Sequence, residues 1–258
     1  MITLVLIGTA AVCGMMFVLW LIHIPMRNAA IVDAGWSFGL ASLGVIYAVG
    51  GDGWEPRRIL IATLALIWGL RLGLYLLFTR IIGHPEEGRY VELRRKWGKN
   101  IKFKFLVFFE FQAILDVVLS GPFLFAAFGS STQFAPLEIA GAIIWIIAIL
   151  GELTADAQLN RFKKNPANKG KSCQVGLWHY SRHPNYFFEW LIWVGLALIS
   201  TASPLGYLGW LSPALILYFV VGLTGIPATE AQALRSRGDE YRAYQRTTSA
   251  FIPWFPKR

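Results

Sequence analysis

The sequence predicts an all-α, polytopic membrane protein with seven transmembrane helices, the N-terminus outside and the C-terminus in the cytosol. Hydrophobic residues make up 55% of the 258 residues and charged residues only 15%, which leaves more apolar surface than one soluble core can bury. The apolar residues form runs long enough to cross a bilayer. The basic residues gather in alternate loops between these runs.

Seven apolar runs have about the length of a membrane-spanning helix, roughly 20 residues. In chain order they cover residues 2–24, 30–49, 59–82, 103–128, 136–159, 184–200 and 205–226. Pro122 falls inside the fourth run, where it is expected to kink or end the helix because proline lacks an amide hydrogen. No internal repeat or low-complexity linker divides the chain, so we expect one membrane domain over residues 1–258.

The basic residues test this count independently, because Lys and Arg favour the cytosolic loops of membrane proteins. Arg57 and Arg58 fall in the second loop, and Arg71 falls inside the third run. The other 21 of the 24 basic residues fall on one side: Arg27, eight from Arg80 to Lys104, six from Arg161 to Arg182 and six from Arg235 to Arg258. An odd number of spans with this bias places the C-terminus in the cytosol, in a bacterial inner membrane or an equivalent one.

The net charge of +9 is compatible with several kinds of polyanion. Because the basic residues lie next to apolar runs, we expect membrane lipid and a phosphorylated cofactor as partners, and no nucleic acid. Cys13 lies in an apolar run and Cys173 in a cytosolic loop, so neither a disulfide framework nor a cysteine metal site is expected. We expect no bound metal, and we expect the protein to be a monomer.

Ionisable residues in the first three runs are the first candidate site, because each costs about 2.5 to 3.5 kcal/mol at membrane depth. Asp33 lies near the cytosolic end of the second run. It is either an interfacial helix cap or a carboxyl facing a cavity, protonated so that it can donate a hydrogen bond. Trp68, Arg71 and Tyr75 share one face of the third helix. Arg71 needs an anionic partner, for which Asp33 is a candidate, either in a functional site or as a structural ion pair.

Glu152, Asp156 and Asn160 recur every four residues near the cytosolic end of the fifth run. They form a polar stripe that lipid would not tolerate, so a solvated pocket is expected beside it. A basic run follows, which either holds phosphate groups or is an ordinary membrane-proximal loop: Arg161, Lys163, Lys164, Lys169 and Lys171.

The start of the sixth run carries the densest set of polar residues in the chain. Pro184 suits the first turn of a helix, which places Arg182 and His183 in front of the helix N-terminus, where anions are favoured. Asn185 and Glu189 share a face of that helix. This arrangement predicts a cofactor site at the cytosolic boundary, with a polar surface cap as the alternative.

These residues resemble the steroid 5-alpha-reductase-like membrane superfamily, specifically bacterial proteins of unknown function related to its C-terminal half. The resemblance rests on residues 176–190, on the stripe of Glu152, Asp156 and Asn160, and on the tail 239–253. It covers the C-terminal half well and the N-terminal half loosely. In that superfamily the C-terminal half looks like a cradle for NADPH within a seven-helix bundle. This chain likewise lacks the G-x-G-x-x-G motif of other dinucleotide-binding folds.

The resemblance implies that residues 136–258 bind NADPH and that residues 1–135 form the substrate pocket. Steroid reductases hold the substrate ketone with a Gln-Glu pair in the second helix and a Tyr in the third. Here Val32 and Asp33 replace that pair, and Trp68 stands where the Tyr would be. Together with the polar stripe and the basic run, the resemblance gives the predicted cofactor contacts: Glu152, Asp156, Asn160, Arg161, Lys163, Lys171, Tyr180, Arg182, His183, Asn185, Tyr186, Glu189, Glu230, Tyr241 and Arg242.

The sequence therefore predicts an NADPH-dependent reductase. Its expected reaction is the reduction of the carbon–carbon double bond of a conjugated ketone in a hydrophobic, steroid-like substrate, of the 3-oxo-4-ene steroid 5-alpha-reductase type. We expect Asp33 and Tyr75 to polarise the substrate carbonyl as catalytic residues. The expected substrate-binding residues are Trp36, Trp68 and Arg71.

Two other functions stay open on the sequence. Isoprenylcysteine carboxyl methyltransferases share the Arg-His-Pro-x-Tyr start and a tail with glutamate, but they use S-adenosylmethionine. Their tail tends to carry a Glu-Glu pair, where this chain has only Glu230, and the large basic cluster suits a cofactor with several phosphates better. A non-catalytic lipid-binding or transport protein would also carry polar residues at membrane depth, although inverted repeats and helices broken at the midplane are not evident.

Overall fold

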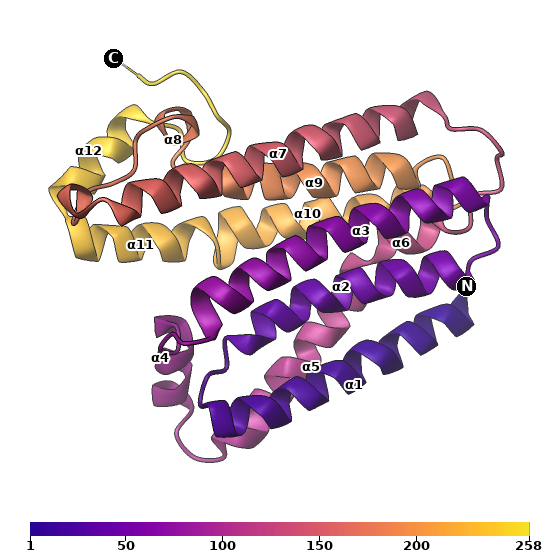
Figure 1. Ribbon diagram of the computed structural model, residues 1–258, viewed down its shortest axis with the longest axis horizontal. Helices are drawn as coiled ribbons and strands as arrows, with labels where there is room; N and C mark the ends of the chain where they lie inside the picture. The colour runs from indigo at the N-terminus through magenta and orange to yellow at the C-terminus, as the bar shows by residue number, and fades with distance from the viewer. Residues whose placement is uncertain (258) are drawn as a thin grey trace. The chain divides into compact units, whose positions relative to one another are not determined.

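The computed structural model describes residues 1–257 and is all-α (Figure 1). The chain divides into two compact units. Unit 1 comprises Met1–Ala135 and Ser200–Gly209, and unit 2 comprises Pro136–Ile199 and Trp210–Arg258. The division between residues 135 and 136 falls between the two halves that the sequence distinguishes. The sequence does not predict that Ser200–Gly209 belongs with the first half.

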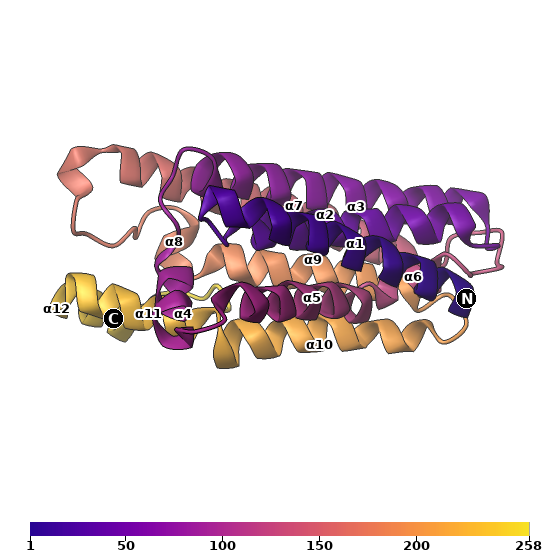
Figure 2. The same cartoon turned by 90° about the horizontal axis from the view of Figure 1, so that it is seen from below.

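Unit 1 is a bundle of helices joined by short turns, and α2 is its central element. In chain order the helices are α1 (Ile2–Met26), α2 (Ile31–Gly50), α3 (Glu55–Leu76), the π-helical continuation η1 (Leu77–Ile81), α4 (Gly88–Trp97), α5 (Ile101–Leu119) and α6 (Gly121–Ala126). Helix α2 packs against α1, α3, α5 and α6, and α1 also runs beside α5 (Figure 2). The central position of α2 explains why most of its side chains are buried.

Small residues allow α2 and α3 to approach closely. A side chain on Gly44 would collide with Ala65, and one on Gly69 would collide with the backbone of Ser37. Helices in a membrane associate mainly through close packing of this kind, since lipid tails are as apolar as the side chains. The glycines of the second and third apolar runs are therefore what brings these two helices together.

Unit 2 contains one long helix and several shorter ones. They are α7 (Pro136–Lys164), the 3-10 turn η2 (Pro166–Asn168), α8 (Leu177–Tyr180), α9 (Pro184–Ser200), α10 (Leu211–Leu217), the π-helical η4 (Tyr218–Leu223), α11 (Ile226–Arg237) and α12 (Asp239–Thr247). The 3-10 turn η3 (Gly206–Trp210) lies almost wholly in unit 1 and leads into α10. Gly141 on α7 and Gly195 on α9 face each other's backbone, and a side chain on either would collide with the other helix. The long axis of unit 2 is thus built from α7 and α9.

Five helical segments among the described residues are long and apolar enough to cross a membrane, so the chain is a polytopic membrane protein. They are Ile2–Met26, Ile31–Gly50, Glu55–Ile81, Pro136–Lys164 and Gly206–Arg237. These segments contain five of the seven predicted spans.

The other two predicted spans differ from the expectation for physical reasons. The fourth is divided at Ser120 into α5 and α6, and Pro122 lies in the first turn of α6, which confirms the predicted break. Helix α5 also carries four charged residues within its 19 residues. The sixth span is α9, whose 17 residues extend about 26 Å at 1.5 Å per residue, less than the roughly 30 Å of bilayer hydrocarbon.

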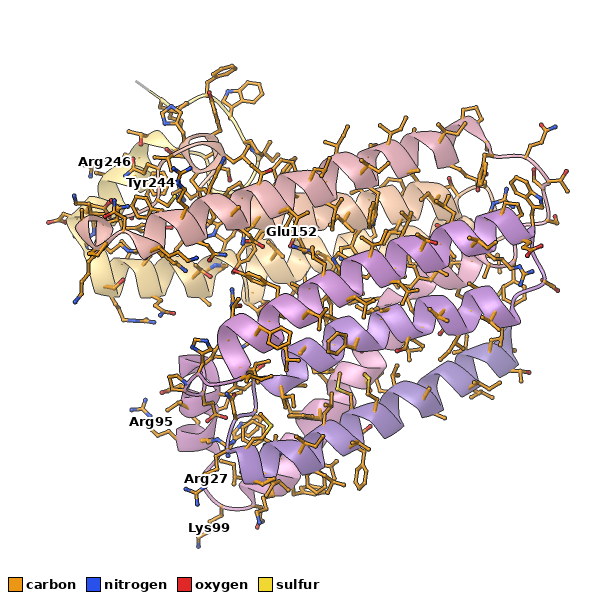
Figure 3. All side chains as sticks on the ribbon, in the orientation of Figure 1. Arg27, Arg95, Lys99, Glu152, Tyr244 and Arg246 are labelled. Carbon is orange, nitrogen blue, oxygen red and sulfur yellow. The ribbon has the colours of Figure 1, made fainter. Side chains whose placement is uncertain are left out.

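The basic residues of unit 1 gather at one end of its helices. Figure 3 shows Arg27, after α1, together with Arg95 and Lys99 from α4 and the following turn. In unit 2, Arg246 lies on α12, at the end where α7 finishes in a basic run (Figure 3). Arg258, which the sequence counts with the cytosolic basic residues, lies outside the described residues. Each unit considered alone therefore has one strongly basic end.

Arg57, one of the exceptions to the charge bias, has a structural role in unit 1. Its side chain is fully buried and donates hydrogen bonds to the carbonyl oxygens of Gly129, Ser131 and Gln133, at 2.8, 3.0 and 3.1 Å. Its guanidinium also lies 5.6 Å from the centre of the Trp54 ring. Arg57 therefore fastens the loop after α6 to the start of α3. Because its charge is buried within the protein, it is not evidence for the side of the membrane on which this loop lies.

Candidate functional site

A polar cluster joins α2 to α4 in unit 1. One carboxylate oxygen of Asp33 accepts a hydrogen bond from Arg89, and the other accepts one from the Tyr90 hydroxyl at 2.8 Å. Arg89 also donates to the Tyr90 oxygen at 2.7 Å. Both oxygens of Asp33 thus accept hydrogen bonds in the structure, whereas one of the two hypotheses from the sequence has a protonated Asp33 donating one.

Tyr90 is the buried member of this cluster, with a side chain that is 1% exposed. Burial, reinforced by the negative charge of Asp33, raises the pKa of the Tyr90 hydroxyl well above its usual value, so the hydroxyl stays protonated. Neither Tyr90 nor Arg89 was singled out from the sequence, which proposed Arg71 as the candidate partner of Asp33. The available signal was the mixture of acidic, basic and apolar residues on α4, an amphipathic helix within the stretch from Arg80 to Lys104 that is counted above only for its basic residues.

A second ion pair holds α4 against the start of α2. Arg94 donates to Glu86 through Nε at 2.7 Å and through Nη2 at 3.0 Å. Glu86 also accepts a hydrogen bond of 2.7 Å from the backbone amide of Ala29, just before α2. The side chain of Glu86 is 9% exposed. The position of α4, and with it the Asp33 cluster, is therefore fixed at two points.

Two of the predicted substrate-binding residues meet in unit 1. The rings of Trp36 on α2 and Trp68 on α3 pack edge to face, with centroids 5.6 Å apart and an interplanar angle of 77°. Trp68 is fully buried. Arg71 and Tyr75 follow on the same face of α3, at spacings of three and seven residues, and both are partly buried. The structure thus gives an aromatic contact between α2 and α3, one turn along α2 from Asp33.

The central feature of unit 2 is the carboxylate of Glu230 on α11. Arg182 donates to its Oε1 through Nε and lies at the same 2.7 Å through Nη2. Gln245 on α12 donates to the other oxygen at 2.7 Å. His183 and the Tyr241 hydroxyl both lie 3.3 Å from Oε1, and burial raises the pKa of Tyr241 to about 12, which keeps its hydroxyl a donor. We call these five residues the Glu230 cluster.

Arg182 is held by more than this carboxylate. Its Nη1 donates to the carbonyl oxygens of Gln245, at 3.2 Å, and of Thr248. Its backbone amide donates to the carbonyl of Ser249 at 2.8 Å. The side chain is 9% exposed. The sequence predicts that Arg182 faces an anionic cofactor, but in this structure its donors serve the protein, where they fasten the C-terminal segment to the start of α9.

The first turn of α9 places the remaining polar residues of its segment. The rings of His183 and Tyr186 are stacked, with centroids 5.3 Å apart and an interplanar angle of 9°. The Tyr186 hydroxyl lies 3.2 Å from the hydroxyl of Thr229 on α11. Stacking and this hydrogen bond orient both rings, so the first turn of α9 presents a fixed polar surface.

The polar stripe of α7 meets α9 at Asp156. The Asn185 amide nitrogen lies 3.5 Å from the Asp156 carboxylate, at the limit of a hydrogen bond. Glu189, one turn further on α9, accepts a hydrogen bond of 3.0 Å from Trp193. Glu152 is buried midway along α7 (Figure 3). The structure therefore brings Asp156 and Asn185, both expected cofactor contacts, within 3.5 Å of each other.

An open hollow of about 430 Å³ lies beside the end of α7. Three of its residues recur at helical spacing on one face of α7, and three come from the chain that follows: Gln158, Arg161 and Phe162, then Asn165, Asn168 and Val175. Only Arg161 was predicted. The spacing of the others can be read from the sequence, but the predicted site used the stripe of Glu152, Asp156 and Asn160, which lies on a different face of the helix.

Several predicted cofactor contacts lie on the surface of unit 2. Arg242 pairs with Asp239 at 2.9 Å on an exposed face of α12. Lys163 and Lys171 are exposed, and Tyr180 is 39% exposed. The hollow begins at Gln158 and does not include Glu152, Asp156 or Asn160. The predicted contacts are thus spread over the Glu230 cluster, the contact between α7 and α9, the lining of the hollow at Arg161, and the exposed surface of the unit.

Comparison with known families matches residues 19–248 to the family described as protein of unknown function (DUF1295). The chain belongs to this family. The match begins inside α1 and ends at the last residues of α12, so it includes both the cluster around Asp33 and the Glu230 cluster. Both are therefore parts of the domain that DUF1295 proteins share.

Two similar proteins are informative. An uncharacterized protein, C594.04c, of Schizosaccharomyces pombe is 24% identical over 270 residues, which cover 92% of this chain and 76% of that protein. The probable O-methyltransferase ustE of Ustilaginoidea virens is 41% identical over 73 residues. That second match covers 28% of this DUF1295 chain and only 25% of the methyltransferase. No solved structure matches the chain.

Proposed function

We propose that this DUF1295 protein is an NADPH-dependent membrane reductase that saturates the carbon–carbon double bond of a conjugated ketone in a hydrophobic, steroid-like substrate. The observation that carries the proposal is the hollow beside α7, which has amide and guanidinium groups in its lining, with Lys163 and Lys164 between two of the lining residues in the chain. The resemblance of the chain to the steroid 5-alpha-reductase-like superfamily adds support, since residues 176–190 and the tail 239–253 resemble the sequence pattern of that superfamily.

The hollow fits a phosphate-bearing group by its size and chemistry. Its volume of about 430 Å³ lies within the range of roughly 300–1,000 Å³ that is usual for small-molecule sites. Arg161 can bind a phosphate with two parallel hydrogen bonds, and Asn165 and Asn168 add amide groups. Under this proposal Arg161 and Lys163 hold phosphates, and Asp156 and Asn185 hold uncharged polar parts of NADPH. When bound, NADPH supplies the hydride.

The groups of unit 1 act on the substrate in this proposal. The Trp36 ring, held in place by its contact with the buried Trp68 ring, offers an aromatic face for flat hydrocarbon rings. Donors such as the Tyr75 hydroxyl polarise the carbonyl oxygen, which gains negative charge as the β carbon accepts the hydride. The α carbon then takes a proton from water, so that two hydrogens are added in total. Asp33 acts by orienting the donors Arg89 and Tyr90, its partners in the structure.

We also propose that α5 with α6, and α9, cross the membrane in addition to the five apolar segments, which gives seven spans. The support is the distribution of charge, because 21 of the 24 basic residues fall in alternate loops. The N-terminus would then lie outside and the C-terminus in the cytosol. The hollow, which lies beside the basic end of α7, would open toward the cytosolic pool of nucleotides.

One observation favours a second candidate, a methyltransferase that uses S-adenosylmethionine. The segment similar to a probable O-methyltransferase is short, but its 41% identity over 73 residues is higher than that of the longer match. The two candidates differ in the charge of the cofactor. NADPH carries several phosphate groups and therefore requires cationic side chains in its site, whereas S-adenosylmethionine carries no phosphate group.

The experiment that separates them measures which cofactor the purified protein binds. We expect NADPH to raise the thermal unfolding temperature in detergent and S-adenosylmethionine to leave it unchanged, and we expect a 3-oxo-4-ene steroid to stimulate NADPH oxidation. Asn185→Ala should weaken NADPH binding by about 10- to 150-fold, the equivalent of roughly 1.5 to 3 kcal/mol. The control is Gln232→Ala, which alters an exposed residue of α11 and should have no effect on binding.

Three outcomes would contradict the proposal. Stabilisation by S-adenosylmethionine without any by NADPH would establish the methyltransferase. Stabilisation by neither cofactor would favour a lipid-binding or transport protein. An equal effect of Asn185→Ala and Gln232→Ala on NADPH affinity would remove the contact between α7 and α9 from the cofactor site.

A further inference from the structure

The C-terminal tail is held by its backbone, yet its large apolar side chains are exposed. The Trp254 amide donates a hydrogen bond of 2.9 Å to the Tyr180 carbonyl. The side chains of Ile252, Trp254 and Phe255 are nevertheless 57%, 70% and 76% exposed. An ordered group of exposed apolar side chains marks a surface with a partner.

The contacts of α8 with α7 show at which depth in the membrane the tail lies, because α7 is one of the five membrane-crossing segments. The Trp178 ring nitrogen donates to the carbonyl of Ala155 at 2.9 Å, and the Leu177 amide donates to the Gln158 side chain at 2.8 Å. Helix α7 carries no charged residue from 139 to 151, and polar residues appear in every turn beyond that stretch.

Counted from Ile139 at 1.5 Å per residue, about 30 Å of hydrocarbon ends near residue 159 of α7. Helix α8 contacts Ala155 and Gln158, just before that point. Helix α8 therefore lies at the boundary between the hydrocarbon and the headgroups. The tail runs beside α8 (Figure 1), and the Phe255 ring packs edge to face on the Tyr180 ring, with centroids 6.0 Å apart.

The chemistry of the tail matches that level of the membrane. Aromatic side chains are enriched at the boundary between lipid and water, where one part of the ring is apolar and another is wet. Arg246 and Lys257 are exposed near the same segment, and the Lys257 amide is bonded to the carbonyl of Thr247 on α12 at 2.8 Å. Their positive charges complement acidic phospholipid headgroups.

We propose that Ile252, Trp254 and Phe255 form an interfacial anchor that inserts into the headgroup layer of the membrane crossed by α7, with acidic phospholipids beside Arg246 and Lys257. The anchor fixes the end of α12. Because Gln245 and Thr248 both contact Arg182, it also steadies the Glu230 cluster. The inference does not depend on which reaction the protein catalyses.

A depth measurement tests this anchor on the full chain. The chain contains only Cys13 and Cys173, so a variant with both replaced by serine provides a background for a single bimane label at Trp254→Cys. The labelled protein is reconstituted in vesicles that contain phosphatidylglycerol and is quenched by a lipid with a nitroxide at the headgroup, or by iodide in the water.

The first control is Ile147→Cys on the exposed face of α7, which a nitroxide deep in the acyl chain should quench. The second is Lys169→Cys in the exposed turn after α7, which iodide should quench.

We expect the headgroup nitroxide to quench the label at position 254 at least twice as strongly as it quenches the label at 169, and iodide to show the opposite order. Equal accessibility of positions 254 and 169 to iodide would overturn the proposal. Protection of position 254 from both quenchers, with energy transfer between labelled molecules, would assign the patch to a second copy and overturn it as well. If the labelled variant does not fold, quenching by brominated lipids can be compared between the native chain and Trp254→Phe. An equal loss of fluorescence in the two would contradict the anchor.

Discussion

Arg182 and Glu230 form an ion pair between the start of α9 and α11, with Nε and Nη2 of Arg182 both 2.7 Å from one carboxylate oxygen. Their side chains are only 9% and 15% exposed. Two charges removed from water in this way tolerate the loss of one partner poorly, because the remaining charge is left buried and uncompensated. The pair, 48 residues apart in the chain, is therefore a structural link as well as a candidate functional group.

Arg182→Gln is expected to destabilise the protein strongly. Breaking a buried pair costs about 3–5 kcal/mol, and the loss should appear as a lower midpoint of denaturant unfolding in detergent. The matched control is Arg242→Gln, which removes the exposed pair with Asp239 in the same unit and should change stability little. Equal midpoints for the two variants would show that the buried pair contributes nothing beyond a surface contact.

Asp33→Asn tests the cluster around Asp33 in the proposed reductase. We expect NADPH affinity to stay nearly unchanged and turnover to fall by about 10² to 10³, the usual scale for losing an oriented donor at a developing oxyanion. Tyr90→Phe should have an effect in the same direction, since it removes the hydroxyl bonded to Asp33. Asp52→Asn, in an exposed turn of unit 1, is the control. If Asp33→Asn instead prevents folding or cofactor binding and leaves the rate per bound cofactor intact, Asp33 is only a structural partner.

Gly176→Ala should destabilise unit 2 more than Gly170→Ala does. Both glycines have positive φ angles, +60° and +79°, which cost a non-glycine residue about 1–2 kcal/mol. A methyl group at 176 would also collide with the Gln158 side chain, whereas the space around 170 is open. The difference between the two variants in thermal unfolding isolates this collision. Equal effects of the two substitutions would show that Gln158 moves aside freely.

The orientation of the chain can be tested by labelling single cysteines in intact cells. Cysteines at Lys99 and Lys171 should react only after the inner membrane is made permeable, because they lie among the basic residues expected in the cytosol. Cysteines at Asp52 and Ser131 should react from outside. Modification of position 171 in intact cells would reverse the proposed orientation and remove the hollow from the cytosolic side.

The long apolar runs made five of the helices predictable, because length and apolar composition determine which segments can cross a bilayer. The two shorter spans were harder to judge, since α9 has only 17 residues and Pro122 begins a new helix. Helix α4 was missed because its sequence, GRYVELRRKW, is charged throughout. The amphipathic character of α4 can be interpreted only when the helix is placed against the start of α2, and α2 is distant in the sequence.

The candidate site was predictable in its residue types and less so in its pairings. Arg182 and Glu230 were both named, but nothing local indicated that they bind each other, and Gln245 was not named at all. Asp33 likewise pairs with a residue 56 positions away. Spacing along one helix reveals which side chains share a face, while a partner from another helix depends on how the helices pack. That information is not contained in periodicity.

The return of Ser200–Gly209 to unit 1 has a consequence for biosynthesis. Gly129 has no room for a side chain because Ser203 lies against it, so the loop fastened by Arg57 is completed by a segment that the ribosome makes about seventy residues later. The first 135 residues can enter the membrane early but cannot reach their final packing until α7 and α9 have also been translated. A chain cut between residues 135 and 136 would therefore yield an N-terminal fragment that requires the second fragment to supply residues 200–209 in trans.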